Sequence, residues 1–316
     1  MNERKLISWV VPCFNEEEVI SDTIKRILDI SSSINNYLFE LILVDDGSQD
    51  NTRDIIKSYI IANKRIRLIG LSRNFGHQYA VQAGLNNSQG SAVIIIDADL
   101  QDPPELAKAM IQKWEDGFDV IYGQRIERAS ESHFKKITAS IFYRILNSLS
   151  EIEIPLDTGD FRLIDRKVID ALKAMPEKGR FIRGLVSWSG FRQVAIPYKR
   201  QPRFAGRTKY SIKKMFVFAI EGITSFSRRP LRLATLFGLI CALFSFFWIG
   251  YVLYIRLFTN AWVEGWAALA VAILFATGVQ LICIGILGEY VGRIYLETKG
   301  RPMYLIDENI TSNDLK

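Results

Sequence analysis

Two long stretches without charge constrain this chain more than any other feature. No charged residue occurs from Leu233 to Ile255 or from Gly265 to Gly288. A helix of about 20 apolar residues crosses the hydrocarbon core of a bilayer, so each stretch is long enough to span a membrane. The alternative is a pair of buried core helices, but two such runs in one short domain would be unusual. We therefore expect a transmembrane hairpin over residues 231–292, with spans at 233–255 and 265–288.

The residues that flank the hairpin predict its orientation. The loop 256–264 between the spans carries one basic and one acidic residue, whereas basic residues stand outside both spans. The flanking basic residues are Arg228, Arg229, Arg232, Arg293, Lys299 and Arg301. The positive-inside rule places both flanks in the cytoplasm. The apolar run near the N-terminus is too short for a signal peptide. We therefore expect a cytosolic domain over residues 1–210 and a cytosolic tail over 293–316.

A second membrane feature is expected just before the hairpin. Apolar residues recur at i, i+3 and i+4 through residues 211–230, accompanied by lysines and arginines. This pattern predicts an amphipathic helix that lies in the membrane surface. An amphipathic helix packed on the cytosolic domain is the alternative, because periodicity alone does not separate the two.

The net charge of +6 indicates a polyanionic partner, which can be nucleic acid, anionic lipid or a phosphorylated substrate. The segment from Lys199 to Arg232 holds ten lysines and arginines and a single acidic residue, Glu221, so the excess charge resides there. Because this segment adjoins the membrane spans, we expect lipid and lipid phosphate as partners and no nucleic acid.

The scarcity of soft metal ligands limits the cofactor. Three cysteines and two histidines, all scattered, exclude a disulfide framework, a zinc site and a histidine-rich centre. A divalent metal would have to be held by oxygen ligands, which favours Mg²⁺ or Mn²⁺.

The N-terminal part alternates short apolar runs with helical patterns. Strands are expected at 6–11, 39–44, 66–71, 92–96 and 120–122, and helices at 16–30, 52–61, 78–85 and 104–114. This alternation predicts an α/β fold with a doubly wound, mostly parallel sheet. Ligands bind beyond the carboxyl ends of strands in such sheets, and the acidic clusters of this chain lie there.

The strongest of these clusters follows the strand expected at 92–96. In an extended chain Asp97, Asp99 and Gln101 would face the same way and present three oxygen groups to one hard cation. The alternative is a turn that caps the next helix. After the strand at 39–44, Asp45 and Asp46 exceed what helix capping requires, so one of them is a candidate to bind a base or ribose.

After the first strand, Phe14 could pack on a planar base and Asn15 could cap a helix. The phosphate-binding fingerprints of dinucleotide-binding folds and P-loops are absent, as is the nucleophile elbow of hydrolases. A kinase or a hydride-transfer enzyme is therefore disfavoured.

Four motifs in this order, VPCFNEE, VDDGSQDNT, LSRNFGHQ and DADLQDPPE, resemble those of family 2 glycosyltransferases with the GT-A fold. The later RFAGRTKYS and the two apolar runs extend the likeness to the polyprenyl-phosphate glycosyltransferases. That group includes dolichyl-phosphate-mannose synthases and bacterial bactoprenol glucosyltransferases. The resemblance implies a cell-envelope enzyme of the bacterial inner membrane, with more than one span and a cytoplasmic catalytic domain. A homo-oligomer through the membrane helices is left open.

The resemblance also implies roles for individual residues. The nucleoside of a sugar nucleotide would be held by Pro12, Phe14, Glu16 and Asp46. Its diphosphate would be bridged by a divalent metal on Asp97, Asp99 and Gln101. The catalytic residues would be Asp157, Asp99 and Arg203, with Arg203 on a phosphate of the donor or the lipid. Gly159-Asp160-Phe161 stands where the family commonly has Ser-Gly-Phe. The resemblance assigns no role to His77, which is a candidate either to touch donor or acceptor or to be a structural histidine.

The expected reaction is the transfer of a sugar to polyprenyl (undecaprenyl) phosphate by metal-assisted, inverting in-line attack. UDP-glucose is the favoured donor, and GDP-mannose or another sugar nucleotide is the alternative. A membrane scaffold that binds sugar nucleotide without turnover is an alternative of another class. A processive polysaccharide synthase is disfavoured, because no tryptophan here belongs to a Q-x-x-R-W motif.

Overall fold

The computed structural model describes residues 4–126, 158–199, 227, 229–258 and 265–315. The chain divides into two compact units. The first contains an eight-stranded sheet with its helices and includes residues 302–316, and the second contains two long helices between residues 216 and 301. The expected interfacial helix at 211–230 lies almost entirely outside the described residues.

The sheet has the strand order β7-β5-β6-β4-β1-β2-β3-β8. Its strands are β1 Leu6–Cys13, β2 Leu38–Asp45, β3 Ile66–Leu71, β4 Ala92–Ile95, β5 Val120–Arg125, β6 Thr158–Asp165, β7 Gln193–Tyr198 and β8 Ile306–Ile310. The central strands β4, β1, β2 and β3 are mutually parallel, and β7 is parallel to β5. Antiparallel pairing joins β6 to β4 and β5, and β8 to β3. The expected mostly parallel α/β sheet is thus confirmed.

Helices cover both faces of this sheet. They are α1 Ile20–Ser32, α2 Thr52–Ala62, α3 His77–Asn87, the 3₁₀ helix η1 Pro104–Leu106, α4 Ala107–Glu115, α6 Arg166–Ala174 and α7 Ile182–Trp188. Because side chains alternate along a strand, Trp9 and Val11 of β1 share one core with α1, α2 and α4. Val10 faces α3, where a Cβ added at Gly84 would come within 2.3 Å of its Cγ1. Glycine at this position therefore lets α3 approach the sheet closely.

Most element boundaries expected from periodicity agree with the structure within a few residues, and β3 agrees at both ends. Two differences concern the first strand and helix. β1 continues through Pro12 to Cys13 and pairs with β2 up to that residue. Its pairing with β4 stops at Val10. The missing N–H of Pro12 therefore breaks no hydrogen bond on the β4 side of the strand. The first helix begins at Ile20 rather than residue 16.

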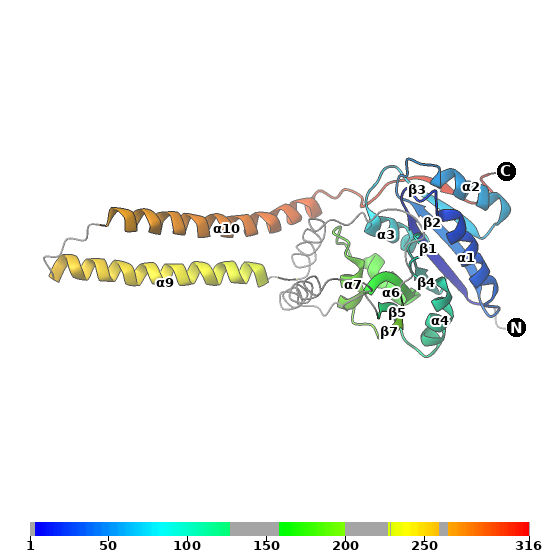
Figure 1. The fold of residues 1–316 in the computed structure, drawn as a ribbon, viewed down its shortest axis with the longest axis horizontal. Coiled ribbons are helices and arrows are strands. Elements are labelled where there is room, and N and C mark those ends of the chain that lie inside the picture. The colour runs from blue at the N-terminus through cyan, green and yellow to red at the C-terminus, as the bar shows by residue number, and fades with distance from the viewer. Residues whose placement is uncertain (1–3, 127–157, 200–226, 228, 259–264, 316) are drawn as a thin grey trace. The chain divides into compact units, whose positions relative to one another are not determined.

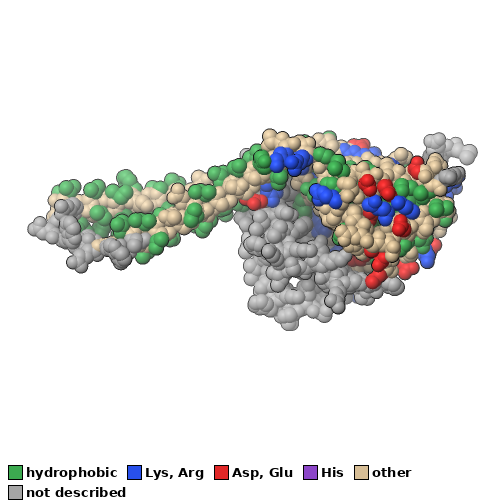
Figure 2. Space-filling model, turned by 90° about the horizontal axis from the view of Figure 1, so that it is seen from above, with side chains coloured by type: hydrophobic (Ala, Val, Ile, Leu, Met, Phe, Trp, Pro, Cys, Tyr) green, Lys and Arg blue, Asp and Glu red, His purple; other side chains and the backbone are tan. Residues whose placement is uncertain are grey.

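The second unit is a pair of long helices, α9 Arg229–Phe258 and α10 Trp266–Thr298, which lie side by side (Figure 1). Tyr290 donates a hydrogen bond to the carbonyl of Ser227 at 2.7 Å. Hydrophobic side chains are exposed along both helices (Figure 2). Arg229–Ile255 and Val271–Thr298 are long and apolar enough to cross a membrane.

The C-terminal tail differs most from expectation. We expected residues 293–316 to form a short cytosolic tail and predicted no helix or strand in it. Instead α10 continues to Thr298, and Ile306–Ile310 forms β8 at the edge of the sheet. Pairing with β3 in the first unit gives this short acidic segment its strand conformation, a contact that local sequence pattern does not reveal.

Candidate functional site

The carboxyl ends of β1, β2 and β4 meet at one edge of the sheet, because these neighbouring strands are parallel. Pro12 is buried near the end of β1, and Phe14 and Glu16 are half-buried in the loop that follows. Asp46 follows β2, and Asp97 lies just beyond β4. The structure thus brings the predicted nucleoside residues and the predicted metal ligands to the same edge.

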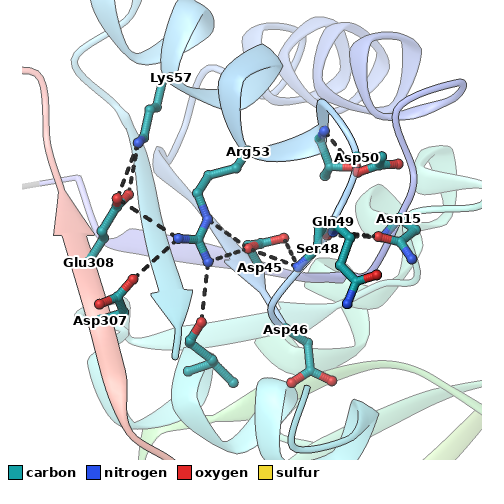
Figure 3. Close-up of polar contacts among 12 residues, drawn as sticks. Asn15, Asp45, Asp46, Ser48, Gln49, Asp50, Arg53, Lys57, Asp307 and Glu308 are labelled. Carbon is teal, nitrogen blue, oxygen red and sulfur yellow. Dashed lines mark hydrogen bonds and ion pairs between the residues drawn. The ribbon is translucent and has the colours of Figure 1, made fainter. Parts of the chain in front are cut away.

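The loops after β1 and β2 are tied together by side chains (Figure 3). The backbone N–H of Asn15 donates to Ser48 Oγ at 2.9 Å, and Asn15 Oδ1 accepts from the Gln49 N–H at 2.8 Å. The N–H of Glu16 donates to Thr52 Oγ1 at 2.8 Å. Asn15, which adopts a positive φ of 54°, therefore bridges two loops through these hydrogen bonds. It is not the helix cap that we expected, because the residue at the N-cap of α1 is Val19.

Asp46 is buried and fastens a third loop to this edge. Its two carboxylate oxygens accept the N–H groups of Phe75 and Gly76 at 2.8 and 2.9 Å. Burial raises the pKa of Asp46, and these two hydrogen bonds act in the opposite direction. Next to it, Gly47 has a φ of +73°, and a Cβ there would lie 2.5 Å from the backbone of Arg73. Only glycine allows the loops after β2 and β3 to approach so closely.

The segment Asp97–Gln101 is a turn and not an extended chain. Leu100 has a φ of 55°, and the N–H of Gln101 donates to Asp99 Oδ1 at 3.1 Å. Asp97, Asp99 and Gln101 therefore do not face one way as alternate residues of an extended segment, and that prediction is wrong. The turn of the alternative is present, but it supplies no side-chain cap to the 3₁₀ helix Pro104–Leu106 that follows.

Asp97 nevertheless has the character of a ligand. Its Oδ1 is buried and has no hydrogen-bond partner among the described residues. Burial raises the pKa of Asp97 to about 6, with further contributions from Asp160, Asp102 and Asp99, whereas His77 lowers it. Among the described residues, no three His, Cys, Asp or Glu side chains are grouped as a metal site. A cation here would take Asp97 together with oxygens of the substrate, which suits Mg²⁺ or Mn²⁺.

A charged cluster surrounds His77 at the start of α3. His77 Nε2 lies 2.9 Å from Asp160 Oδ2 and 3.6 Å from Asp97 Oδ1. Asp160 also accepts from Gln78 Nε2 at 3.1 Å and from Arg183 Nε at 2.7 Å. Burial lowers the pKa of His77, but its bond to Asp160 and the charges of Asp97 and Asp160 outweigh that effect and raise it to about 9.

The same cluster keeps Asp160 ionised. Burial alone would raise its pKa, but the charge of Arg183 and the hydrogen bond from His77 hold it well below the usual range. Periodicity and motif spacing did not single out Gln78 or Arg183. Gln78 belongs to a motif that we quoted, whereas no local signal marks Arg183, which reaches Asp160 from another element.

Asp102, the last acid of the same turn, is fully buried and accepts a hydrogen bond from the Tyr198 hydroxyl. Arg125 Nη2 lies 3.8 Å from Asp102 Oδ2, and Arg125 Nε donates to the Tyr198 hydroxyl at 3.3 Å. Residues of β5 and β7 therefore hold the turn in place. The predicted catalytic residues Asp157 and Arg203 lie outside the described residues.

Comparison with known proteins identifies the family. Residues 8–173, more than half of the chain, match the family described as Glycosyl transferase family 2, and residues 229–294 match the GtrB C-terminal hairpin. The chain belongs to glycosyl transferase family 2. The resemblance given by its four motifs is thus confirmed, and with it the GT-A type of fold and the identity of the chain as a glycosyltransferase.

Several relatives of this family 2 glycosyltransferase match it over nearly their full length. It is 47% identical over 302 residues to the uncharacterized glycosyltransferase YkcC of Bacillus subtilis, covering 96% of this chain and 93% of the relative. It is 42% identical over 300 residues to the bactoprenol glucosyl transferase of Shigella phage SfX, covering 95% and 98%. Among solved structures, mannosyl-3-phosphoglycerate synthase from Rubrobacter xylanophilus has a TM-score of 0.48 at 17% identity, covering 72% of this chain and 74% of that chain.

Replacing Arg183 tests whether the His77 cluster contributes to stability. Arg183→Gln leaves the buried Asp160 without its strongest cation, so we expect a loss of up to about 3 kcal/mol, the low end for a broken buried pair. A loss of that size lowers the unfolding midpoint by several degrees, at about 2–4 °C per kcal/mol. The measurement is thermal unfolding of the full chain in detergent.

The matched control is Arg26→Gln. Arg26 pairs with Glu105 at 2.8 Å, and its side chain is 30% exposed, close to the 26% of Arg183, but Glu105 is 47% exposed where Asp160 is 7% exposed, so the loss of this pair should cost about 1 kcal/mol or less. Equal midpoints for the two variants would contradict a stabilising role for the buried cluster.

Proposed function

We propose that this glycosyltransferase moves a hexose from a nucleotide sugar to a polyprenyl phosphate. The similarity to bactoprenol glucosyl transferases over nearly the whole chain supports the acceptor, and the hairpin match supports a membrane location. The observation that carries the proposal is Asp97 Oδ1, a buried oxygen without a hydrogen-bond partner among the described residues, at the edge where ligands bind. The favoured donor is UDP-glucose, and GDP-mannose or another sugar nucleotide is the alternative.

The buried Asp97 oxygen fits a hard divalent cation, and Asp97, Asp99 and Gln101 are the residues that would hold it. When bound, Mg²⁺ or Mn²⁺ neutralises charge on the diphosphate that leaves. Pro12, Phe14, Glu16 and Asp46 would hold the nucleoside. Because both oxygens of Asp46 already accept backbone N–H groups, we propose that Asp46 acts mainly by shaping the loop around the nucleoside.

The acceptor requires little activation. A phosphate monoester has a second pKa near 6, so it is largely ionised at neutral pH and needs no strong general base. A phosphate oxygen of the acceptor forms a bond to the anomeric carbon while the bond from that carbon to the diphosphate oxygen breaks. The nucleoside diphosphate leaves, and a single in-line attack inverts the anomeric centre.

The protein's main task is to bring two anions together in line. We assign Asp157 to the orientation of the acceptor phosphate or its counter-cation, and Arg203 to contact with a phosphate. The basic segment from Lys199 to Arg232 suits an acceptor whose phosphate lies at an anionic membrane surface. We therefore propose that the reaction takes place on the cytosolic face of the bacterial inner membrane.

A transfer assay tests the reaction directly. Full-length protein in nanodiscs receives undecaprenyl phosphate, Mn²⁺ and radiolabelled UDP-glucose, GDP-mannose or UDP-N-acetylglucosamine in separate reactions. We expect label in the lipid fraction, most strongly from UDP-glucose, with release of one nucleoside diphosphate per sugar transferred. Binding of the nucleotide sugar without transfer would support the scaffold alternative. Failure to glycosylate any polyprenyl phosphate would contradict the main proposal.

Replacing Asp97 tests the metal-dependent part of the proposal. Asp97→Asn keeps the size of the side chain but removes its charge, so transfer should fall by about 100-fold or more, the size of effect seen when one charge-stabilising group is lost from an active site. Chelation of metal by EDTA should give a similar loss in the unmodified protein.

The control for this experiment is Asp116→Asn. Asp116 is exposed and pairs with Lys113 at 3.0 Å on the surface, so its replacement should leave transfer unchanged. Transfer by Asp97→Asn at the rate of the unmodified protein, with the same Mn²⁺ dependence, would show that Asp97 is not a ligand.

A further inference from the structure

The chain end that follows the hairpin docks along the sheet-containing unit. We call Met303–Ile310 the C-terminal strap. Arg180 Nε donates to Met303 Sδ at 3.3 Å, and Asn86 Nδ2 donates to the Tyr304 hydroxyl at 2.8 Å. The carbonyl of Leu305 accepts from the Ser72 N–H at 3.0 Å, after which β8 pairs with β3. The strap is thus held along its length by residues of the first unit.

Two acidic residues of the strap face Arg53 of α2 (Figure 3). Arg53 Nη1 lies 3.4 Å from Asp307 Oδ2 and 3.8 Å from Glu308 Oε1. Glu308 also pairs with Lys57 at 2.9 Å, one turn further along α2. The strap therefore supplies negative charge to one face of the guanidinium group.

The other side of Arg53 contacts the end of β2. Its Nε and Nη2 lie 2.9 and 2.8 Å from Asp45 Oδ2, and the Asp45 side chain is completely buried. Nη2 also donates to the carbonyl of Leu71 at 3.2 Å. A Cβ at Gly70 would come within 3.2 Å of Arg53 Cζ. The absence of a side chain at Gly70 lets the guanidinium lie close to the sheet.

The ion pair between Arg53 and Asp45 lies at the start of the loop that follows β2, which we assign to the nucleoside side of the donor site. Asp45 precedes Asp46 and accepts the N–H of Ser48 at 3.2 Å. A buried carboxylate depends on its cation, whereas an arginine that loses its acidic neighbours can move its charged end into water. The acids of the strap therefore help to keep Arg53 on Asp45.

We propose that Asp307 and Glu308 are positioning residues of the donor site, which act through Arg53 and Asp45 on the loop after β2. This inference rests on the proposed function, because it takes that loop as the nucleoside side of the site. Residues 299–305 join α10 to β8, so the chain that leaves the membrane hairpin also braces the donor loop.

The simpler role for the strap is to cover the edge of the sheet, and the chain offers a control for it. Asn309 Oδ1 accepts from Arg67 Nε at 2.7 Å, and Arg67 also donates to the carbonyl of Asn87 at 3.3 Å. The contact between Arg67 and Asn309 joins β3 to β8 but does not involve Arg53. Asn309→Ala therefore weakens docking of the strap without removing charge from Arg53.

The experiment compares D307N/E308Q, the milder D307N and N309A with the unmodified full-length protein in nanodiscs. Hydrogen exchange is measured in peptides that contain Ser48, Phe75 and Gly76, and binding of UDP and GDP with Mn²⁺ is measured by calorimetry. We expect D307N/E308Q to speed exchange in these peptides and to weaken binding of the preferred nucleotide, each by about 5-fold or more, the lower range for coupled sites. D307N should show a smaller change in the same direction. For both variants, the rate of transfer at saturating donor should stay within about 2-fold of the rate of the unmodified protein.

If hydrogen exchange and nucleotide affinity are unchanged in D307N/E308Q, the inference is overturned. It is also overturned if N309A changes both as much as D307N/E308Q does, because the strap would then only cover the edge of the sheet. If D307N/E308Q does not fold, D307N carries the same comparison with N309A. An unmodified protein that binds neither nucleotide would count against the proposed function, and the exchange measurement would still decide the role of the strap.

Discussion

Burial of carboxylates at the carboxyl edge of a parallel sheet is the constraint on which the rest of this structure depends. A carboxylate that leaves water must be matched by cations or hydrogen-bond donors. Asp45 pairs with Arg53, and Asp46 accepts hydrogen bonds from two backbone N–H groups. Asp160 pairs with Arg183 and His77. The contacts of Asp46 and Asp160 join segments that are distant in sequence, and that of Asp45 joins β2 to the helix that follows it, so the acids order the loops around the site. Asp97 Oδ1 has no hydrogen-bond partner among the described residues, and His77 Nε2 lies 3.6 Å from it, so this oxygen keeps the capacity to hold a ligand.

The local pattern of the sequence was sufficient for features with strong periodicity. Apolar runs predicted the central strands and the two long helices, and the position of Asp97 at the end of β4 predicted its place at the site edge. The strands β6, β7 and β8 were not predicted, and β6 and β8 were missed for a common reason. Both contain charged residues that pattern analysis treats as exposed, yet Asp160 and Arg162 of β6 are buried. Their strand conformation depends on pairing with residues far along the chain.

The details of the site depended on tertiary contacts and could not be predicted from local sequence. The residue type and position of Asn15 fit a helix cap, but its side chain accepts a hydrogen bond from the Gln49 N–H in the neighbouring loop. Asp97–Gln101 forms a turn because Asp99 accepts the Gln101 N–H and Leu100 takes a positive φ. Arg183 and Arg53 carry no local signal, because their role is set by the buried acids that they reach. The family resemblance identified the loops, and the structure adds the side chains that hold them.

The central claim is that the buried Asp97 oxygen binds the cation that accompanies the donor diphosphate. The most direct test is a crystal of the full-length protein grown with UDP and Mn²⁺, measured near the manganese absorption edge. An anomalous peak within coordination distance of Asp97 and of a diphosphate oxygen, about 2.0–2.4 Å from each, is the expected result for a hard cation on oxygen ligands. A manganese peak on other residues, with bound UDP and no density at Asp97, would contradict the account.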